Sequence, residues 1–163
     1  MNKKIFIIFH NIYTLNQILE KLQKIDIDYN ICDKFTTDIN MEDSSYACSY
    51  TYINQIEINK ALKNNSLLYI VTNEYVSTGI TSDDFENSNI FCLSYKEFNN
   101  ISDLIFKKYD IMTIWIDSKK EINMIDTKYE IPLIEKRLES INYEYFLDTE
   151  TQKIITYIED FLT

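Results

Sequence analysis

Glycine is nearly absent from this sequence, in which Gly79 is the one glycine among 163 residues. Loops that wrap around a phosphate need glycines wherever the backbone approaches the phosphate closely or takes a positive φ. The composition therefore excludes a standard Walker A loop, and with it the enzymes that depend on that loop to grip a nucleoside triphosphate.

Cysteine and histidine are also scarce. Cys32, Cys48 and Cys92 are odd in number, widely spaced and without a CxxC pair, which indicates reduced thiols in a cytoplasmic protein rather than a zinc site. His10 is the single histidine, and the sequence contains neither an HExxH nor a GxSxG motif. Zinc protease and serine hydrolase activities are therefore not expected.

Negative charge exceeds positive charge, with a formal net charge of −10 and an isoelectric point near 4.5. An acidic surface opposes binding to a nucleic-acid backbone, because each phosphate contact normally needs a cation on the protein. The apolar run near the N-terminus is too short to span a bilayer. We therefore expect neither a nucleic-acid partner nor a membrane partner.

Apolar runs alternate between strand-like and helix-like patterns along the chain. Hydrophobic residues make up 45% of the sequence, which suffices for one domain over residues 1–163. Lys4–Phe9 predicts a strand that is buried on both faces in a parallel sheet. Further strands are predicted at Tyr29–Cys32, Tyr50–Tyr52, Leu67–Val71, Asn89–Ser94, Asp110–Asp117 and Tyr143–Asp148.

Capping and turn residues divide the segments between these strands. Thr14 is a candidate N-cap for a helix to about Lys24. Gly79 is expected to permit a tight turn. The polar stretch Asp33–Asp38 is expected at the carboxyl edge of the sheet, where parallel sheets hold ligands. Other helices are predicted at Ile53–Leu62, after Thr81 or Ser82, at Tyr95–Ile101, at Pro132–Ser140, and from Thr149 or Thr151 onward, with a loop at 118–129.

The order of these elements resembles a guanylate kinase-like nucleoside monophosphate kinase over almost the whole chain. Lys34–Asp38 looks like the family segment with a threonine pair, and Tyr50–Ile53 is similar to its tyrosine-bearing strand near the acceptor phosphate. Ser77–Thr81 is similar to the family's Tyr-Gly-Thr turn, with Gly79 as the matching residue. Tyr145–Thr149 resembles the late strand that precedes the terminal helix.

This resemblance implies an α/β fold: a three-layer, P-loop-kinase-like domain with a mainly parallel sheet. It also implies a small β-rich insertion on the acceptor side at about residues 40–95 and a lid-like segment at about residues 118–140. Both segments would belong to one guanylate kinase-like domain over residues 1–163.

The resemblance further implies a set of site residues. Thr14 matches the hydroxyl that holds magnesium, and Asp117, at the end of a strand, is a second candidate magnesium ligand. Arg137, the single arginine, resembles the lid arginine that stabilises charge on a transferring phosphoryl group. His10 is placed to meet a phosphate. The candidate nucleotide-binding residues are His10, Thr14, Thr36, Tyr50, Tyr52 and Gly79.

Each of these residues also has a plainer interpretation. Thr14 would serve as a helix cap, His10 as an ordinary loop residue, and Arg137 as part of a solvated helix face. Asp117 would only end a strand. The tyrosines Tyr50, Tyr52, Tyr69 and Tyr75 fit base stacking, core packing and a protein-binding surface, and the sequence does not separate these three.

Two departures from the family pattern decide the functional prediction. Phe9–Thr14 replaces the glycine-rich loop, with Tyr13 in place of the phosphate-binding lysine. Asp38 stands where the family has an arginine, and a carboxylate repels a monophosphate. We therefore predict a catalytically inactive binding or regulatory protein with no cofactor, which acts through a protein partner or a residual nucleoside monophosphate cleft.

Two alternatives stay open at the level of the sequence. The first is an active nucleoside monophosphate kinase with an unorthodox loop, in which His10 and Thr14 bind ATP, Asp117 holds magnesium and Arg137 stabilises the transferring group. The second is an acidic mimic or inhibitor that occupies a basic surface of a partner protein, which follows from the net charge of −10.

Overall fold

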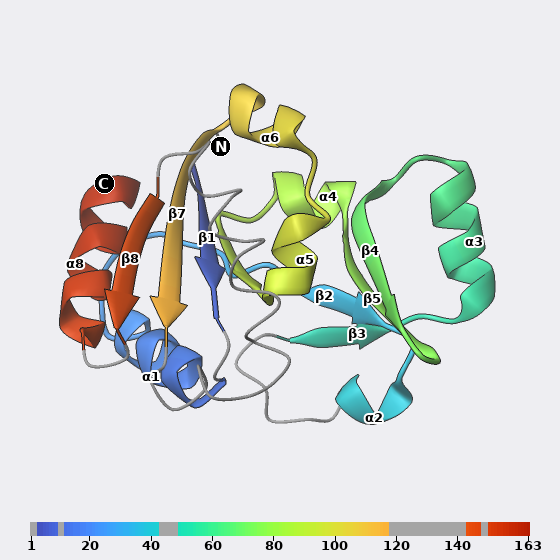
Figure 1. Ribbon diagram of the computed structural model, residues 1–163, viewed down its shortest axis with the longest axis horizontal. Coiled ribbons are helices and arrows are strands. Elements are labelled where there is room, and N and C mark those ends of the chain that lie inside the picture. The colour runs from blue at the N-terminus through green and yellow to red at the C-terminus, as the bar shows by residue number, and fades with distance from the viewer. Residues whose placement is uncertain (1–2, 10–11, 43–48, 118–142, 148–149) are drawn as a thin grey trace.

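The computed structural model describes residues 3–9, 12–42, 49–117, 143–147 and 150–163. These residues form two four-stranded sheets, here called sheet A and sheet B, which lie beside each other (Figure 1). Helices cover both faces of sheet A, so the centre of the molecule is an α/β fold.

Sheet A has the strand order β6-β1-β7-β8, and every neighbouring pair of strands is parallel. The apolar residues of β1 are fully buried on both faces. A continuous apolar run is what a strand needs when helices cover the sheet on both sides. The strands of sheet A are β1 (Lys3–Ile8), β6 (Ile90–Leu93), β7 (Asp110–Asp117) and β8 (Tyr143–Leu147).

Alternate residues of β1 point into two separate cores. Ile5 and Ile7 pack with the apolar stripes of α1 and α8. Phe6 and Ile8 pack on the opposite face, with an aromatic-rich cluster that includes residues of α4, α5 and α6. The result is the predicted three-layer arrangement. Its helices are α1 (Ile12–Leu22), α4 (Ser82–Glu86), α5 (Tyr95–Asn99), α6 (Asp103–Lys108) and α8 (Thr151–Leu162).

Sheet B is mixed and has the strand order β3-β2-β5-β4. β2 and β3 are parallel, whereas β5 is antiparallel to both β2 and β4. Figure 1 shows α3 at the outer end of this part of the molecule. The elements are β2 (Lys34–Thr36), α2 (Ile39–Glu42), β3 (Tyr50–Tyr52), α3 (Gln55–Lys63), β4 (Leu67–Asn73) and β5 (Val76–Thr81).

Most of the predicted strands are confirmed with small shifts at their ends, including β1, β3, β4, β6, β7 and β8. The cap predicted at Thr81 is confirmed, because its side chain accepts a hydrogen bond from the amide of Asp84 at 3.1 Å. The predicted loop at 118–129, the predicted helix at 132–140 and the candidate cap Thr149 lie outside the described residues.

The strand predicted at Tyr29–Cys32 is wrong. Only Ile31 forms a bridge there, with Ile90 of β6. The strand is instead β2, whose residues Lys34 and Thr36 are polar and yet almost completely buried. A pattern of apolar residues does not reveal a strand whose polar side chains are buried by pairing with other polar groups.

Two predicted caps are also wrong. α1 begins at Ile12, so Thr14 is a buried residue inside the helix rather than its cap. α8 begins at Thr151, after Glu150 at the N-cap position. The short helices α2 and α6 were not predicted, because they are too short for the apolar period to show.

Lys4, in the central strand β1, is fully buried. Its ammonium donates hydrogen bonds to the carbonyl oxygens of Phe85, Glu86 and Ser88 at 2.6, 3.2 and 2.6 Å. It also lies 4.7 Å from the ring centre of Phe85. Burial lowers the pKa of Lys4, although the negative charge of Glu86 acts in the opposite direction and raises it. The side chain thus gives carbonyl oxygens in the last turn of α4 and just after it a charged donor, in addition to the backbone amides that already bond to the Phe85 oxygen.

Gly79 does not form a turn, contrary to the prediction. It lies inside β5 opposite Phe35 of β2, and its φ is not positive. The hairpin turn consists of Glu74–Tyr75, and Glu74 there has a φ of 51°. A Cβ atom at position 79 would lie 2.3 Å from the carbonyl oxygen of Tyr69 and 2.5 Å from Cζ of Phe35. Glycine is therefore needed at position 79 because there is no room for a Cβ atom, and not because the backbone takes a positive φ.

Gly79→Ala is expected to destabilise the protein by about 3 kcal/mol, because the added methyl group forces apart the backbone of β4 and the ring of Phe35. The midpoint of urea unfolding measures the change. Thr51→Ala, an exposed change on β3, is the matched control and should stay within about 0.5 kcal/mol of the wild type. Equal midpoints for Gly79→Ala and Thr51→Ala would contradict this assignment.

Candidate functional site

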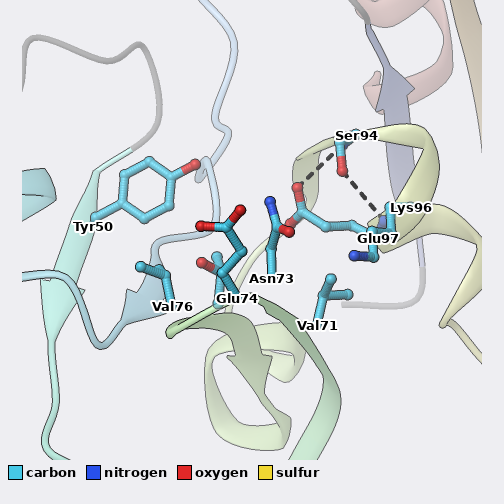
Figure 2. A pocket seen from close by; sticks show the side chains of 9 residues that line it. Tyr50, Val71, Asn73, Glu74, Val76, Ser94, Lys96 and Glu97 are labelled. Atoms are coloured by element: carbon cyan, nitrogen blue, oxygen red, sulfur yellow. Dashed lines mark hydrogen bonds between the residues drawn. The ribbon is translucent and has the colours of Figure 1, made fainter. Parts of the chain in front are cut away.

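A cavity of about 360 Å³ opens between sheet B and the first turn of α5. Its walls come from β3, from the β4–β5 hairpin and from the segment that joins β6 to α5 (Figure 2). The volume falls within the range of small-molecule pockets, roughly 300–1,000 Å³. The lining residues are Tyr50, Val71, Asn73, Glu74, Val76, Thr78, Ser94, Lys96 and Glu97.

One of the lining residues, Glu97, forms a buried ion pair with Lys34, which is not among the described lining residues. The ammonium of Lys34, in β2, lies 3.0 Å from Oε2 of Glu97 and donates to Oε1 at 3.1 Å. The side chain of Lys34 is 1% exposed and that of Glu97 is 10% exposed. Because β2 belongs to sheet B and α5 follows a strand of sheet A, the pair connects the two sheets.

Glu97 has further donors around its carboxylate. The amide of Ser94 donates to Oε1 at 3.2 Å, and the amide of Glu97 donates back to the Ser94 hydroxyl, also at 3.2 Å. These two bonds form the capping box that starts α5, and Figure 2 shows them as dashed lines. The hydroxyl of Tyr69, from β4, donates to Oε2. Elements from both sheets therefore meet at one carboxylate.

Glu97 stays charged although it is buried. Burial by itself raises the pKa of this carboxyl, but the Lys34 ammonium and the hydrogen bonds from Tyr69, Lys34 and Ser94 together hold the pKa below its ordinary value of 4.5. Burial and the charge of Glu97 raise the pKa of Tyr69 well above its ordinary value. Tyr69 therefore keeps its proton and acts as a donor.

The open side of the cavity carries a different set of polar groups. Asn73 and Glu74 lie at the end of the hairpin, and the Glu74 carboxylate points into the space between Tyr50 and Asn73 in Figure 2. The φ of 51° at Glu74 is an unusual backbone conformation for a residue with a side chain. Such conformations cluster at binding sites, where the surrounding structure holds them in place. Lys96 contributes an ammonium from α5.

The structure brings only part of the predicted acceptor site to this cavity. Tyr50 lines the cavity, and its predicted contact with a nucleotide stays a prediction. Gly79 follows the lining residue Thr78 but is itself packed against Phe35. Tyr52 is 38% exposed on β3 and does not appear among the described lining residues.

Thr36 is buried within β2, and its hydroxyl accepts a hydrogen bond from the amide of Asp38 at 3.1 Å. The two other tyrosines considered for a stacking surface differ in role, since Tyr69 is a buried core residue and Tyr75 is 96% exposed at the hairpin tip. Thr36 and Tyr69 are therefore buried residues of sheet B, whereas Tyr75 is exposed.

The predicted catalytic and metal-binding residues are not assembled in the part of the chain that the structure describes. His10 and Arg137 lie outside it, and for Asp117 the structure gives only the backbone, paired with Leu147 at the end of β7. The hydroxyl of Thr14 is buried inside α1. The described residues contain no group of three or more His, Cys, Asp or Glu side chains placed to hold a metal, so we derive no step through magnesium.

Sequence reasoning missed the ion pair of Lys34 and Glu97, and it named Tyr69 without its hydrogen bond to Glu97. One signal was present: Ser94 followed three positions later by Glu97 is the sequence signature of a capping box. That signature agrees with the helix predicted from Tyr95. It would not have revealed the ion pair, since Lys34 and Glu97 are separated by 63 positions.

Of the comparisons with known proteins, the one with solved structures gives a match and the other two do not. No family model matches the sequence, and no curated protein matches it. Among solved structures, the chain is similar to a guanylate kinase from Anaplasma phagocytophilum, with a TM-score of 0.67 over 99% of this chain and 84% of that one. The fold is guanylate kinase-like.

The two sequences are 10% identical, so the likeness concerns the fold. It confirms the predicted fold class, an α/β domain with a parallel sheet and a second, mixed sheet. Among the described residues, no helix combines the length and the apolar character needed to cross a bilayer.

Tyr69→Phe is expected to destabilise the protein at neutral pH by about 1.5–3 kcal/mol, because the buried Glu97 carboxylate loses one of its donors. The pKa of Glu97 in the folded protein lies below 4.5. The charged carboxylate therefore stabilises the fold fully above about pH 4.5, and this stabilisation is lost as the pH falls through the pKa of the folded state. The difference between variant and wild type should therefore narrow below about pH 4.5.

Urea unfolding measured at steps from neutral pH to acid pH tests this expectation. Tyr75→Phe is the matched control, because that hydroxyl belongs to a side chain that is 96% exposed, and its unfolding curve should follow the wild type at every pH. A constant difference between Tyr69→Phe and the wild type across the acid range would contradict the assigned charge state of Glu97.

Proposed function

We propose that this protein is a catalytically inactive binding or regulatory protein with a guanylate kinase-like fold, which acts through a protein partner. One observation carries the proposal: the ammonium of Lys34 is already paired with Glu97, which lines the cavity. Lys96 is the remaining cationic side chain among the described residues that line the cavity. Phosphoryl transfer depends on cations placed around the transferring group.

The sequence supports the same conclusion from the donor side. Phe9–Thr14 offers no glycine and no lysine where a phosphate loop would need them. The carboxylate of Glu74 projects into the cavity on the acceptor side. Both halves of a phosphoryl-transfer site are therefore poorly suited to anionic substrates.

A protein partner fits the surface near the cavity. Tyr75, beside Glu74 at the tip of the β4–β5 hairpin, is 96% exposed, and tyrosine is enriched at interface hot spots. The net charge of −10 favours a partner with a basic surface. A cytoplasmic location is part of the proposal, supported by the three cysteines of the sequence, which are odd in number and widely spaced.

Binding of a nucleoside monophosphate without transfer is the second candidate function. Its support is the position of Tyr50 in the wall of a cavity of about 360 Å³. Because the similar solved structure is a guanylate kinase, guanosine monophosphate is the first ligand to test.

Purified protein mixed with ATP, magnesium and each common nucleoside monophosphate is expected to form no more ADP than a protein-free reaction. The measurement is ADP formation over time, with an active guanylate kinase as positive control. Turnover that Arg137→Ala abolishes would overturn the proposal and establish the kinase alternative. A rise in melting temperature with guanosine monophosphate but without turnover would instead favour the second candidate function.

Association with a partner is expected to depend on the hairpin tip and on salt. Tyr75→Ser should weaken binding of a captured partner by at least about tenfold, as for an interface hot spot. The matched control is Leu104→Ser, since Leu104 is also exposed, at 69%, but lies on α6. Partners are captured from a lysate of the producing cells, and affinity is then measured at low and high salt. Equal affinities of the two variants for the partner, or an affinity that does not change with salt, would contradict the proposal that the partner binds at the hairpin tip.

A further inference from the structure

β4 forms one end of sheet B, so one side of this strand has no neighbouring strand in the described part of the chain. Figure 1 shows α5 and α3 on either side of the β4–β5 hairpin. The side of β4 that faces away from β5 is here called the outer edge. β4 has 7 residues, whereas β3, at the other end of sheet B, has 3. The outer edge is therefore the longer of the two edges of this sheet.

The register of the hairpin shows which backbone groups lie on the outer edge. A two-residue turn closes on a hydrogen-bonded pair, which here is Asn73 and Val76, and such pairs alternate with pairs that are not hydrogen-bonded. The N–H and C=O groups of Ile70 and Thr72 therefore point away from β5. Within the described residues, no backbone hydrogen bond from another segment reaches these groups.

The outer edge also lacks the residues that keep edge strands apart in most proteins. Natural edge strands commonly carry lysine or proline, or are bent by a bulge. Leu67–Asn73 contains no charged residue and no proline, and its register shift lies at the start of the strand, between Leu67 and Tyr69. Thr72 is exposed and Ile70 is partly exposed. Such an edge is a template for another extended strand.

We propose that the outer edge is a self-association site, at which β4 of a second copy of this chain pairs antiparallel and joins two copies of sheet B into one sheet. A strand that pairs antiparallel with itself has two-fold symmetry, so every contact is made twice. A two-fold axis at Val71 places Ile70 opposite Thr72 of the other copy. Each outward N–H and C=O group of these two residues then has a partner.

The distribution of charge favours a second copy as the occupant. Two chains of net charge −10 repel each other, but the uncharged strand β4 allows a close approach. Antiparallel pairing also directs Glu74, at the hairpin tip, toward the end of α3 of the other copy. The last turn of α3 carries Lys60 and Lys63. Opposite charges therefore approach each other at both ends of the paired strands.

Self-association through one pair of strands is expected to be weak, because stable interfaces bury about 1,600 Å² and a single strand pair buries less. Repulsion between the two acidic chains opposes it at low ionic strength, so the dimer should tighten as salt is added. The inference goes beyond the proposed function, and the two are distinguishable, since association with a basic partner protein weakens with salt.

Sedimentation equilibrium of the purified protein over a wide concentration range is the first test. In high salt, the wild type is expected to form dimers with a Kd of about 10–100 µM. Thr72→Asp places a carboxylate on the outer edge and should raise this Kd at least about tenfold. Thr51→Asp is the matched control, because it adds the same charge at an exposed position of β3, at the opposite end of sheet B. Its Kd should equal that of the wild type.

A second measurement tests the register and does not depend on a change at Thr72. Val71 and its copy would form a pair without hydrogen bonds, with Cα atoms about 4.5 Å apart, which a disulfide can span. Val71→Cys, oxidised with diamide, is therefore expected to give a covalent dimer on a non-reducing gel. Asn73→Cys is the matched control, because residue 73 and its copy would lie about 13 Å apart along the strands. Wild type treated in the same way reports cross-linking by the natural cysteines.

Any of three results would overturn the inference. A wild type that stays monomeric at every concentration and salt would leave the outer edge to an extended segment of another protein. Equal Kd values for folded Thr72→Asp and Thr51→Asp would place the contact between copies elsewhere. A folded Val71→Cys that cross-links no faster than Asn73→Cys would exclude the two-fold axis at Val71. Circular dichroism establishes that each variant is folded.

Discussion

The buried pair of Lys34 and Glu97 holds the two halves of this molecule in one arrangement. Lys34 comes from β2 of sheet B, and Glu97 comes from α5, which follows directly on a strand of sheet A. Removing two charges from water is costly, and their mutual attraction offsets this cost only when the geometry is good and other donors complete the network. Here Tyr69 and Ser94 are those donors, so a buried polar contact joins the two sheets beside the apolar packing of Tyr69 and Ile80 against residues of sheet A.

The fold was largely readable from the sequence, for reasons that particular segments make clear. Lys4–Phe9 and Asp110–Asp117 are continuous apolar runs, and such runs are strands buried on both faces. The terminal helix showed an apolar stripe, and that stripe is buried. β2 was misplaced because Lys34 and Thr36 are buried for polar reasons, which a hydrophobic pattern does not register.

The site was less readable than the fold. Tyr50 was identified from the resemblance, and it lines the cavity. Glu97 was missed and Tyr69 was named without its bond to Glu97, because these roles arise from contacts between segments that lie far apart in the sequence: Tyr69 and Glu97 are 28 positions apart, and Lys34 and Glu97 are 63 apart. Gly79 was identified as important for the wrong reason, since a position with no room for a Cβ atom and a tight turn both require glycine and look the same in a sequence.

The buried position of Lys4 bears on how this chain assembles. Carbonyls at the end of α4 and just after it accept hydrogen bonds from a side chain more than eighty positions earlier in the sequence, with a separation of 81 for Phe85 and 84 for Ser88. These bonds form only when the first strand is in place beside α4, although local backbone bonds already cap the helix. Hydrogen exchange at the end of α4 would report the docking of the N-terminal strand, a long-range event whose loop-closure entropy makes it slow relative to local helix formation.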